Sequence, residues 1–367
     1  MEKPDTTANT KTADQAEMFA NRLKKRFRHL GKWAKRTGTG AFRLYDRDIP
    51  EVPLVLDIYT NDLDGSIASG ALYKRPYEKD EVEESLWLNA MQNAAAQALG
   101  IEEDSVIIKL RQRQQGQAQY EKVSRQGLTR EVQESGLKFK VNLSDYLDTG
   151  LFLDRRVMRR MVKADSQGKR VLNLFCYTAS FSVYAAAGGA VSTDSVDLSN
   201  TYLEWGRNNF ALNDFGTEML KREEYFNRSH AATVGKGHRL IRADVSAFLK
   251  DAKAARLRWD SIVIDPPAFS NSTMAQNDFD LQRDFMDLLN AATTLLAPNG
   301  KLWFSASARS FRGTESELET ALAQKPSNFT VTDISGKTVD EDFKGRKTPK
   351  AFVIAYSTAT IEDRTTL

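Results

Sequence analysis

Short apolar runs alternate with helical segments through the second half of the chain. Residues 171–175 are an apolar run typical of a strand buried on both faces. Small and hydroxyl side chains follow at 176–180, and an apolar helix is expected at 181–187, ended by Gly188 and Gly189. The same alternation predicts further strands at 190–197, 239–244, 259–265, 301–305, 329–335 and 351–357, and helices at 200–213, 245–255 and 279–296. It therefore indicates an α/β fold with right-handed crossovers and a mostly parallel, seven-stranded sheet.

The first half of the chain has a more mixed pattern. Residues 1–14 are polar and predict a disordered tail, whereas residues 15–38 carry apolar side chains at helical spacing among many Lys and Arg. Strands are expected on both sides of a turn signal at 61–65, and a strand from 105 onward runs into a basic, glutamine-rich turn. Another strand is expected at 137–143. A helix at 78–99 is expected to present an apolar stripe made of Val82, Leu86, Leu88, Met91 and Ala95.

These patterns divide the chain into three parts. A tail and a basic amphipathic helix occupy residues 1–40, a small α+β accessory domain occupies 41–143, and the α/β domain occupies 144–367. The α/β domain is expected to open with a basic helix striped by Phe152, Val157, Met161 and Val162. Three roles are open for the basic amphipathic helix: it could lie on a membrane surface, bind RNA phosphates, or pack against its own protein. Core packing is favoured over lipid, because no second membrane signal is present.

Composition excludes several classes of protein. No run of 18 apolar residues is long enough for a transmembrane helix, and the first 15 residues lack the apolar core of a signal peptide. One cysteine and three scattered histidines predict neither an internal disulfide nor a metal site. We therefore expect a cytoplasmic protein without a structural metal.

The charge is unevenly distributed, although the net charge is only +3. Residues 18–36 hold eight Lys and Arg and no acidic residue. Residues 105–130 hold six against one Glu, and residues 155–170 hold seven against one Asp. Three such blocks predict a basic face that meets a polyanion such as a nucleic acid, although any single block is typical of a solvated surface.

Carboxylates follow three of the predicted strands in the α/β domain. Asp197, Asp244 and Asp265 should meet the turn after Phe175 at one edge of the sheet, where doubly wound folds bind ligands. A carboxylate after the second strand is placed to accept the hydroxyls of a ribose, and one after the third to accept the amino group of an adenine. Each Asp alone is more typical of a helix cap. Together they favour a nucleoside ligand.

The turn at 176–181 contains no glycine. A pyrophosphate cradle needs glycines so that backbone amides can close on the phosphate, which argues against NAD and FAD. An adenosine without phosphate fits better, and S-adenosylmethionine is the obvious candidate. The sequence Asp265-Pro266-Pro267-Ala268-Phe269 then supplies a rigid loop with free carbonyl groups and an aromatic face for a planar base.

Several stretches resemble the ribosomal large-subunit methyltransferase K family, the guanine-N7 enzyme of 23S rRNA, which is related to the cytosine-C5 rRNA methyltransferase I family. They include NRLKKRFRHLGKWAKR, NLSDYLDTGLFLDRR, VLNLFCYTASFSVYAAAGGA and IDPPAFSNS, and the likeness runs from about residue 20 onward. In some bacteria this unit is the second half of a fused protein. The resemblance implies a Rossmann-like S-adenosylmethionine-dependent methyltransferase domain behind a small RNA-binding domain. It also implies 23S rRNA or a large-subunit precursor as substrate, with a separate partner methyltransferase as an open option and the oligomeric state undetermined.

The resemblance also implies a set of site residues. Those carried over as cofactor contacts are Asn173, Phe175, Tyr177, Thr178, Ala179, Asp197, Ser199, Asp244 and Asp265, with Asp154 and Arg155 at the border. Two departures from the family pattern stand out. Residues 216–237 are longer than expected and predict a surface excursion, and Thr273 stands where the family often has lysine.

Guanine N7 is unprotonated at neutral pH and is able to attack a sulfonium methyl directly, so neither a protein nucleophile nor a general base is required. Asp265, Pro266, Pro267 and Phe269 are the residues expected to hold the base and stabilise its growing charge. Cytosine-C5 transfer needs a cysteine thiolate. Related enzymes carry it in a Phe-Ser-Cys-Ser run, which here is Phe-Ser-Ala-Ser at 304–307. Methylation of an exocyclic amine and a non-catalytic RNA-binding role stay open.

Overall fold

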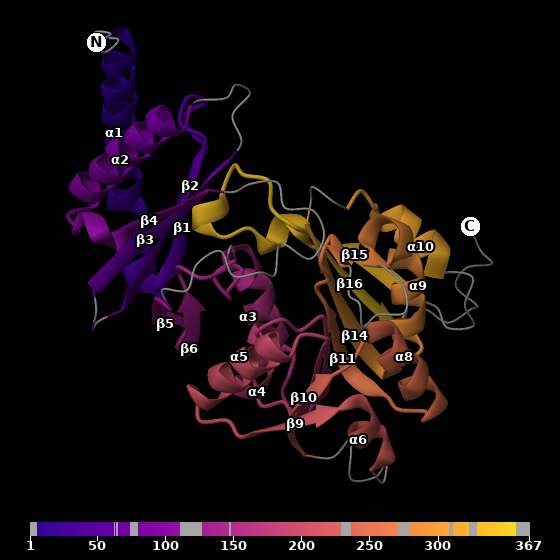
Figure 1. Cartoon of the computed structure of the whole chain (residues 1–367). Coiled ribbons are helices and arrows are strands. Elements are labelled where there is room, and N and C mark those ends of the chain that lie inside the picture. Colours follow the sequence, from indigo (N-terminus) through magenta and orange to yellow (C-terminus); the bar gives the residue numbers. More distant parts are fainter. Residues whose placement is uncertain are drawn as a thin grey trace. The chain divides into compact units, whose positions relative to one another are not determined.

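A computed structural model describes residues 6–61, 63, 65–73, 80–110, 127–146, 148–228, 236–270, 279–307, 311–322 and 329–356. The chain divides into two compact units, Met1–Thr149 and Gly150–Leu367 (Figure 1). We call them the N-terminal unit and the C-terminal unit.

The N-terminal unit is built on a four-stranded sheet in the order β1-β2-β3-β4. Neighbouring strands run antiparallel except β3 and β4, which are parallel. The strands are β1 (Ala41–Asp46), β2 (Leu54–Asn61), β3 (Gly65–Leu72) and β4 (Val106–Leu110), and a separate hairpin joins β5 (Thr129–Glu134) to β6 (Leu137–Asn142). The helices are α1 (Thr6–Thr37) and α2 (Glu81–Leu99), followed by the short turn η1 (Glu103–Ser105).

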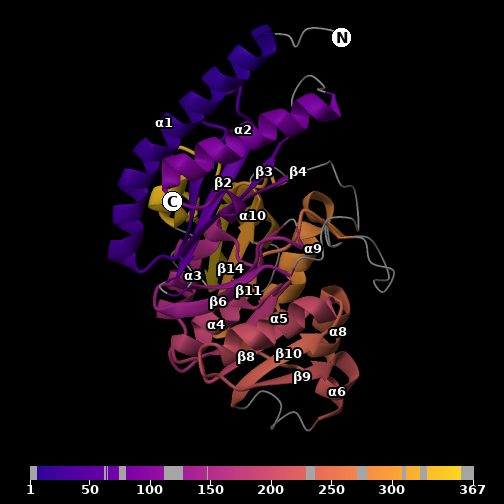
Figure 2. The same ribbon diagram turned by 60° about the vertical axis from the view of Figure 1, so that its left-hand side comes forward.

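Helices α1 and α2 lie side by side against this sheet (Figures 1 and 2). Phe19, Leu23 and Trp33 of α1 are buried in one core with Trp87 and Met91 of α2. The indole nitrogen of Trp87 donates a buried hydrogen bond of 2.7 Å to the side-chain oxygen of Gln15 on α1. The apolar stripe of the basic helix is therefore core, as favoured over a membrane-surface role.

Two expectations for this unit were wrong. The described chain is helical from Thr6, so residues 6–14 are not a disordered tail; packing against α2 carries the helix beyond the point where its apolar stripe begins. Val82 and Leu86 are 70% and 64% exposed, and Trp87 takes the buried position instead. The pattern also missed β5, a mostly polar strand that buries Val132.

The C-terminal unit is an eight-stranded sheet in the order β15-β16-β14-β11-β7-β8-β10-β9. The strands from β14 to β9 are mutually parallel, and β15 and β16 are antiparallel to their neighbours. The parallel strands are β7 (Arg170–Leu174), β8 (Ser192–Asp197), β9 (Thr217–Lys221), β10 (Gly237–Arg242), β11 (Trp259–Ile264) and β14 (Leu296–Ala306). The other two are β15 (Phe329–Asp333) and β16 (Lys350–Tyr356). The predicted α/β class with a mostly parallel sheet is confirmed.

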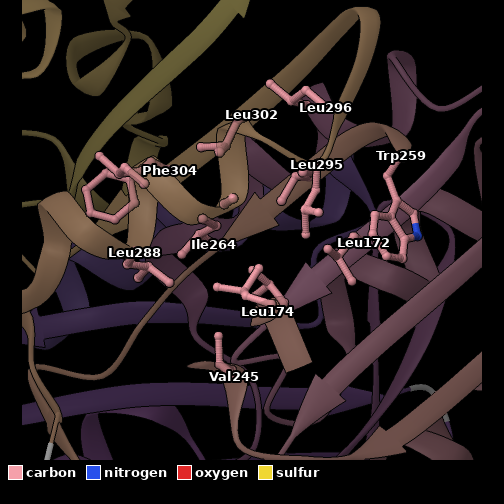
Figure 3. Close-up of a cluster of buried hydrophobic side chains, with 14 of the residues drawn as sticks. Leu172, Leu174, Val245, Trp259, Ile264, Leu288, Leu295, Leu296, Leu302 and Phe304 are labelled. Carbon is pink, nitrogen blue, oxygen red and sulfur yellow. The ribbon is translucent and has the colours of Figure 1, made fainter. Parts of the chain in front are cut away.

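Helices cover both faces of this sheet. One face packs against α3 (Arg156–Ala164) and α4 (Ser180–Ala187), with α5 (Asn200–Ala211) beside α4. The other face packs against α6 (Arg222–Asn227), α8 (Val245–Ala254), α9 (Leu281–Thr293) and α10 (Glu315–Leu322). Figure 3 shows the core on this second face, where Leu174, Ile264 and Phe304 project from adjacent strands toward Leu288 of α9. Three neighbouring strands thus share one apolar layer, which fixes their carboxyl ends at one edge.

The prediction that residues 216–237 form a surface excursion was wrong. Residues 217–221 form β9, which pairs with β10 and makes the sheet eight-stranded instead of seven-stranded. Helix α6 follows, and its Tyr225 is fully buried. With only two apolar residues, the strand sequence TEMLK carries too weak a pattern for recognition.

A buried carboxylate anchors this added segment. Asp194 of β8 is fully buried and accepts hydrogen bonds from the Arg239 guanidinium at 3.1 Å, Tyr225 Oη at 3.2 Å and Trp259 Nε1 at 2.8 Å. Burial raises the pKa of Asp194, while the Arg239 charge and the hydrogen bonds oppose that shift. The network joins β8, β10, β11 and α6, so the packing of α6 depends on one charged group in the core.

Asp194→Ala is expected to lower the free energy of unfolding by about 3–5 kcal/mol, because the mutation leaves the Arg239 charge buried without a counter-charge. Urea denaturation followed by circular dichroism measures this. Tyr225→Phe is the matched control, since it removes one hydrogen bond and should cost about 1 kcal/mol. Equal losses in the two variants would contradict the role given to the ion pair.

Candidate active site

Four adjacent parallel strands bring the predicted polar residues to one edge of the C-terminal unit. The strands lie in the order β11-β7-β8-β10, and Asp265, Phe175, Asp197 and Asp244 lie at or just beyond their carboxyl ends. The backbone nitrogen of Ala243, just before Asp244, donates to the carbonyl oxygen of Asp197 at 3.1 Å. The structure thus places all four on the ligand-binding edge of a doubly wound sheet.

The turn after β7 has an unusual backbone. Phe175, Tyr177 and Ala179 have φ angles of 56°, 52° and 58°, the left-handed region that glycine adopts most easily. Each such residue costs on the order of 1–3 kcal/mol, and strain of this kind gathers at functional sites. Three non-glycine side chains therefore occupy a turn that in dinucleotide-binding folds is glycine-rich.

Asp197 holds the strained turn in place. Its Oδ2 accepts a hydrogen bond from the backbone nitrogen of Tyr177 at 2.9 Å, and its Oδ1 accepts one from that of Ser199 at 2.9 Å. Burial raises the pKa of Asp197 to about 6, and the backbone hydrogen bonds act in the opposite direction. The Ser199 hydroxyl accepts from the backbone nitrogen of Tyr202 at 3.3 Å and so caps α5.

Thr178 faces into the protein. Its hydroxyl donates to the carbonyl oxygen of Gly150 at 2.6 Å, and its own carbonyl oxygen accepts from Asn209 Nδ2 at 2.9 Å. Gly150 has a φ of 94° and lies against Trp205, where an added Cβ would come within 2.2 Å of the indole ring. Sequence reasoning missed Gly150, Asn209 and Trp205, because nothing local in the sequence marks their contact with the turn.

An aromatic cluster surrounds the Tyr177 ring. The ring centroid of Tyr177 lies 4.5 Å from that of Tyr202, 5.2 Å from that of Phe152 and 6.5 Å from that of Trp205. The expectation that Phe152 belongs to the stripe of a basic helix was wrong, because α3 begins only at Arg156. Phe152 precedes a short turn, η3 (Leu153–Arg155), and stays 39% exposed beside the site.

Two other predicted residues have their polar atoms engaged within the fold. The amide of Asn173 is buried and donates to the Ser182 hydroxyl of α4 at 2.9 Å. Asp244 caps α8, and its Oδ1 accepts from the backbone nitrogen of Ala247 at 2.9 Å. Asn173 therefore fixes α4 behind the turn, and Asp244 remains at the edge in its capping role.

Asp265 is paired with Arg155, which also pairs with Asp154. The Arg155 guanidinium lies 3.1 Å from Asp265 Oδ1 and 3.0 Å from Asp154 Oδ2. Burial alone would lower the pKa of Arg155, but the two carboxylates raise it above its ordinary value. The cluster therefore contains two negative charges and one positive charge.

The loop after Asp265 is only partly described. Pro266 is buried, and Pro267 and Phe269 are half-buried. Phe269 belongs to a two-residue strand, β12 (Phe269–Ser270), which pairs with β13 (Phe279–Asp280). The Phe279 ring lies 5.2 Å from that of Phe175, which links this hairpin to the turn after β7. Thr273 lies outside the described residues.

Cys176 is buried in the turn and is 5% exposed. Burial and the nearby Asp197 raise the pKa of its thiol well above the ordinary value. The thiol is therefore protonated at neutral pH and is unsuited to act as a nucleophile.

The donor set fits a nucleoside cofactor. The two oxygens of Asp197 each have a backbone donor and keep further acceptor capacity for ribose hydroxyls. The turn presents side chains, not glycines, where a pyrophosphate would have to approach. Among the described residues, no group of three or more His, Cys, Asp or Glu is arranged to hold a metal ion. No described helix is long and apolar enough to cross a membrane.

Residues 52–343 match the S-adenosylmethionine-dependent methyltransferase family. The chain belongs to this family. It is also 42% identical to the ribosomal RNA large subunit methyltransferase K of Neisseria meningitidis, over 92% of this chain and 87% of that one. It is 44% identical to the methyltransferase K/L of Pseudomonas fluorescens, over 90% of this chain and 39% of the longer relative.

A solved structure supports the methyltransferase fold. A methyltransferase in complex with SAH has a TM-score of 0.68 and 24% identity, and the match covers 93% of this chain and 81% of that one. Membership of the family establishes S-adenosylmethionine as the cofactor of this methyltransferase.

Gly150→Ala is expected to destabilise the turn after β7. The new methyl group would clash with the Trp205 ring, and the alanine backbone would have to keep a φ that is unfavourable for it. Together these effects should lower the free energy of unfolding by about 2–4 kcal/mol. Thermal unfolding and calorimetric titration with S-adenosylmethionine measure stability and affinity together. Gly168→Ala is the control: Gly168 has a φ of 72° with no atom near its Cβ position, so only backbone strain applies. Equal effects would argue against tight packing at Gly150.

Proposed function

We propose that this methyltransferase modifies 23S rRNA in the cytoplasm, at guanine N7. Support for the substrate comes from the relatives, which are named as ribosomal RNA large subunit methyltransferases. The chain spans 87% of the Neisseria relative but about two fifths of the K/L relatives, which have additional sequence. The proposal therefore concerns the unit shared by both kinds of relative.

In this proposal the carboxyl edge holds the cofactor. Asp197 accepts the ribose hydroxyls, Asp244 lies at the adenine end, and the backbone of residues 175–179 borders the methionine part. The bound cofactor supplies a methyl group on a sulfonium centre. The chain's own task is to fix the position of the cofactor and of the base, which is catalysis by proximity and orientation. The Asp197 hydrogen bonds to Tyr177 and Ser199 support this assignment, because they preset the edge before any ligand binds.

The choice of N7 over cytosine C5 rests on the one cysteine in the chain. Cys176 is buried with a raised pKa, and the last residue of β14 is Ala306, at the position where the related cytosine-C5 enzymes carry a thiol. Guanine N7 has a free lone pair at neutral pH, so no residue has to remove a proton. Direct methylation of N7 therefore requires neither a nucleophile nor a proton acceptor from the residues at this edge.

The acidic cluster suits the charge that develops on guanine. Methylation at N7 makes the base cationic, and the group of Asp154, Arg155 and Asp265 carries one net negative charge at the end of β11. Arg155 keeps the Asp265 carboxylate in a fixed orientation, so little reorganisation is needed during the reaction. Pro266, Pro267 and Phe269 are proposed to contact the base itself.

Methylation of an exocyclic amine is the second candidate, because a carboxylate followed by Pro-Pro and an aromatic residue also suits an amino group. That reaction requires loss of a proton from the nitrogen, for which Asp265 would have to act as acceptor. Both Asp265 oxygens already accept hydrogen bonds from Arg155 Nε at 3.2 Å, so the carboxylate is engaged by another group, which favours N7.

Purified protein should transfer labelled methyl groups from S-adenosylmethionine to 23S rRNA from a strain that lacks the gene. Digestion to nucleosides and mass spectrometry should give 7-methylguanosine. Asp265→Asn should reduce the rate by about 10²-fold or more, because it removes the charge that stabilises the cationic base. A product of 5-methylcytidine or an N-methylated exocyclic amine would overturn the N7 assignment, and failure to bind the cofactor would overturn the enzyme assignment.

The affinity for S-adenosylmethionine should depend on pH through Asp197. Its pKa is raised to about 6, and the ionised carboxylate makes the stronger hydrogen bonds to ribose hydroxyls. Affinity should be constant above about pH 7 and fall as the pH drops through 6, by at most about tenfold per pH unit. Calorimetry between pH 5 and 8 tests this. Asp197→Asn should bind weakly with a flat profile, and an equally flat wild-type profile would refute the assignment.

A further inference from the structure

The structure separates the three basic blocks of the sequence by what their charges contact. In the block at 155–170, Arg156 is fully buried and pairs with Asp342 at 3.1 Å. Further ion pairs of this block join Arg155 to Asp154 and Asp265, Arg156 and Arg160 to Asp340, Lys169 to Asp165, and Arg170 to Asp260. Most of these charges are neutralised within the C-terminal unit, so this block is part of the fold and is poorly suited to meet a polyanion.

The block at 105–130 is only partly described. Lys109 turns inward, and its ammonium group donates to the carbonyl oxygen of Tyr146. Burial lowers the pKa of Lys109 to about 8, although Asp148 and Asp145 act to raise it. Residues 111–126 lie outside the described part of the chain, so this block carries no argument.

The block at 18–36 lies on α1 and is different. Arg22 and Arg26 lie 2.7 Å and 3.9 Å from Asp48. The remaining six cations are exposed, and within the described part of the chain none of them forms an ion pair: Lys24, Lys25, Arg28, Lys32, Lys35 and Arg36. We call these six residues the cationic face.

The cationic face is continuous and rigidly supported. Its members recur at helical spacing over 12 residues, which corresponds to about 18 Å along the helix axis. The opposite side of α1 is core, with Leu23 and Leu30 fully or almost fully buried and Trp33 6% exposed. The helix therefore holds its charges in a fixed array, and its apolar side is not available to a lipid surface.

We propose that the cationic face binds the phosphate backbone of a double-helical segment of the rRNA substrate. This inference rests on the proposed function. The positive charge of the face favours a polyanion, and the absence of an exposed Phe, Tyr or Trp ring among the described residues of α1 favours a duplex over a single strand. Single-stranded RNA is bound by exposed aromatic platforms, whereas duplexes are met through phosphates and shape. The Phe and Trp residues of α1 all pack into the core, because Phe19 and Trp33 are buried and Phe27 is half-buried. The one exposed ring among the described residues of α1 is therefore the His29 imidazole.

The triple variant Lys25→Gln, Arg28→Gln and Lys32→Gln tests the cationic face. Glutamine keeps helix propensity and length while removing charge. Binding of an RNA duplex of about 16 base pairs is measured across a salt series, with single-stranded RNA of the same length as comparison. Each phosphate contact contributes about 0.9 to the slope of log K against log salt, so three contacts should lower the slope by about 2.7.

The matched control removes three exposed cations from the other unit: Lys250→Gln, Lys253→Gln and Arg256→Gln. Both variants lose the same net charge, so a general electrostatic effect would change them equally. We expect the α1 variant alone to lose duplex affinity and slope, to raise the KM for 23S rRNA by about tenfold or more, and to keep kcat and cofactor affinity.

The outcomes separate this inference from the proposed function. Equal slopes for the two variants, or a larger loss on single-stranded RNA than on the duplex, would overturn the role of the cationic face. Absence of methyl transfer from the wild-type protein to rRNA would instead overturn the proposed function. The duplex titration does not depend on catalysis, so its result can be read in either case.

Discussion

The hydrogen bonds that Asp197 accepts from the backbone nitrogens of Tyr177 and Ser199 are the constraint on which the site depends. They join the end of β8 to the turn after β7, in which three non-glycine residues have left-handed backbone angles. These angles are unfavourable, so contacts with the rest of the fold are needed to keep them. The aromatic rings around Tyr177 and the Thr178 contact with Gly150 support the same turn from the other side. This edge of the sheet thus has its shape fixed by the protein's own contacts, at the expense of local backbone strain.

Charge is used in two ways in this chain. In the C-terminal unit most basic residues of the block at 155–170 pair with acidic ones, including the buried pair of Arg156 and Asp342. A second buried pair of this unit joins Arg239 to Asp194. Along α1, Arg22 and Arg26 pair with Asp48, whereas the six residues of the cationic face are exposed and form no ion pair among the described residues. Composition alone cannot separate these uses, because a block of Lys and Arg looks the same whether its partners lie far along the chain or are absent.

Much of the architecture could be predicted from the sequence, because buried parallel strands have apolar sequences. In this chain an Asp also marks the carboxyl end of several of them. The positions of β7, β8, β10 and β11 along the chain, and of Asp197, Asp244 and Asp265 at or just after strand ends, follow from that pattern. Contacts between distant residues could not be predicted. Arg155 reaches Asp265 across 110 positions, and β9 became recognisable only through its pairing with β10. The contact between Asn173 and Ser182 could not be predicted either, because it depends on how α4 packs against β7 and not on the local sequence.

The buried pair between Arg156 and Asp342 has a consequence for synthesis of the protein. The two residues are 186 positions apart, so the ribosome makes the guanidinium long before its counter-charge. Until Asp342 emerges, α3 cannot enter the core without burying an unpaired cation, which is strongly unfavourable. The C-terminal unit therefore completes its folding late in translation, whereas the core of α1, α2 and the first sheet contains only residues up to 108 and can assemble while the rest of the chain is still being made.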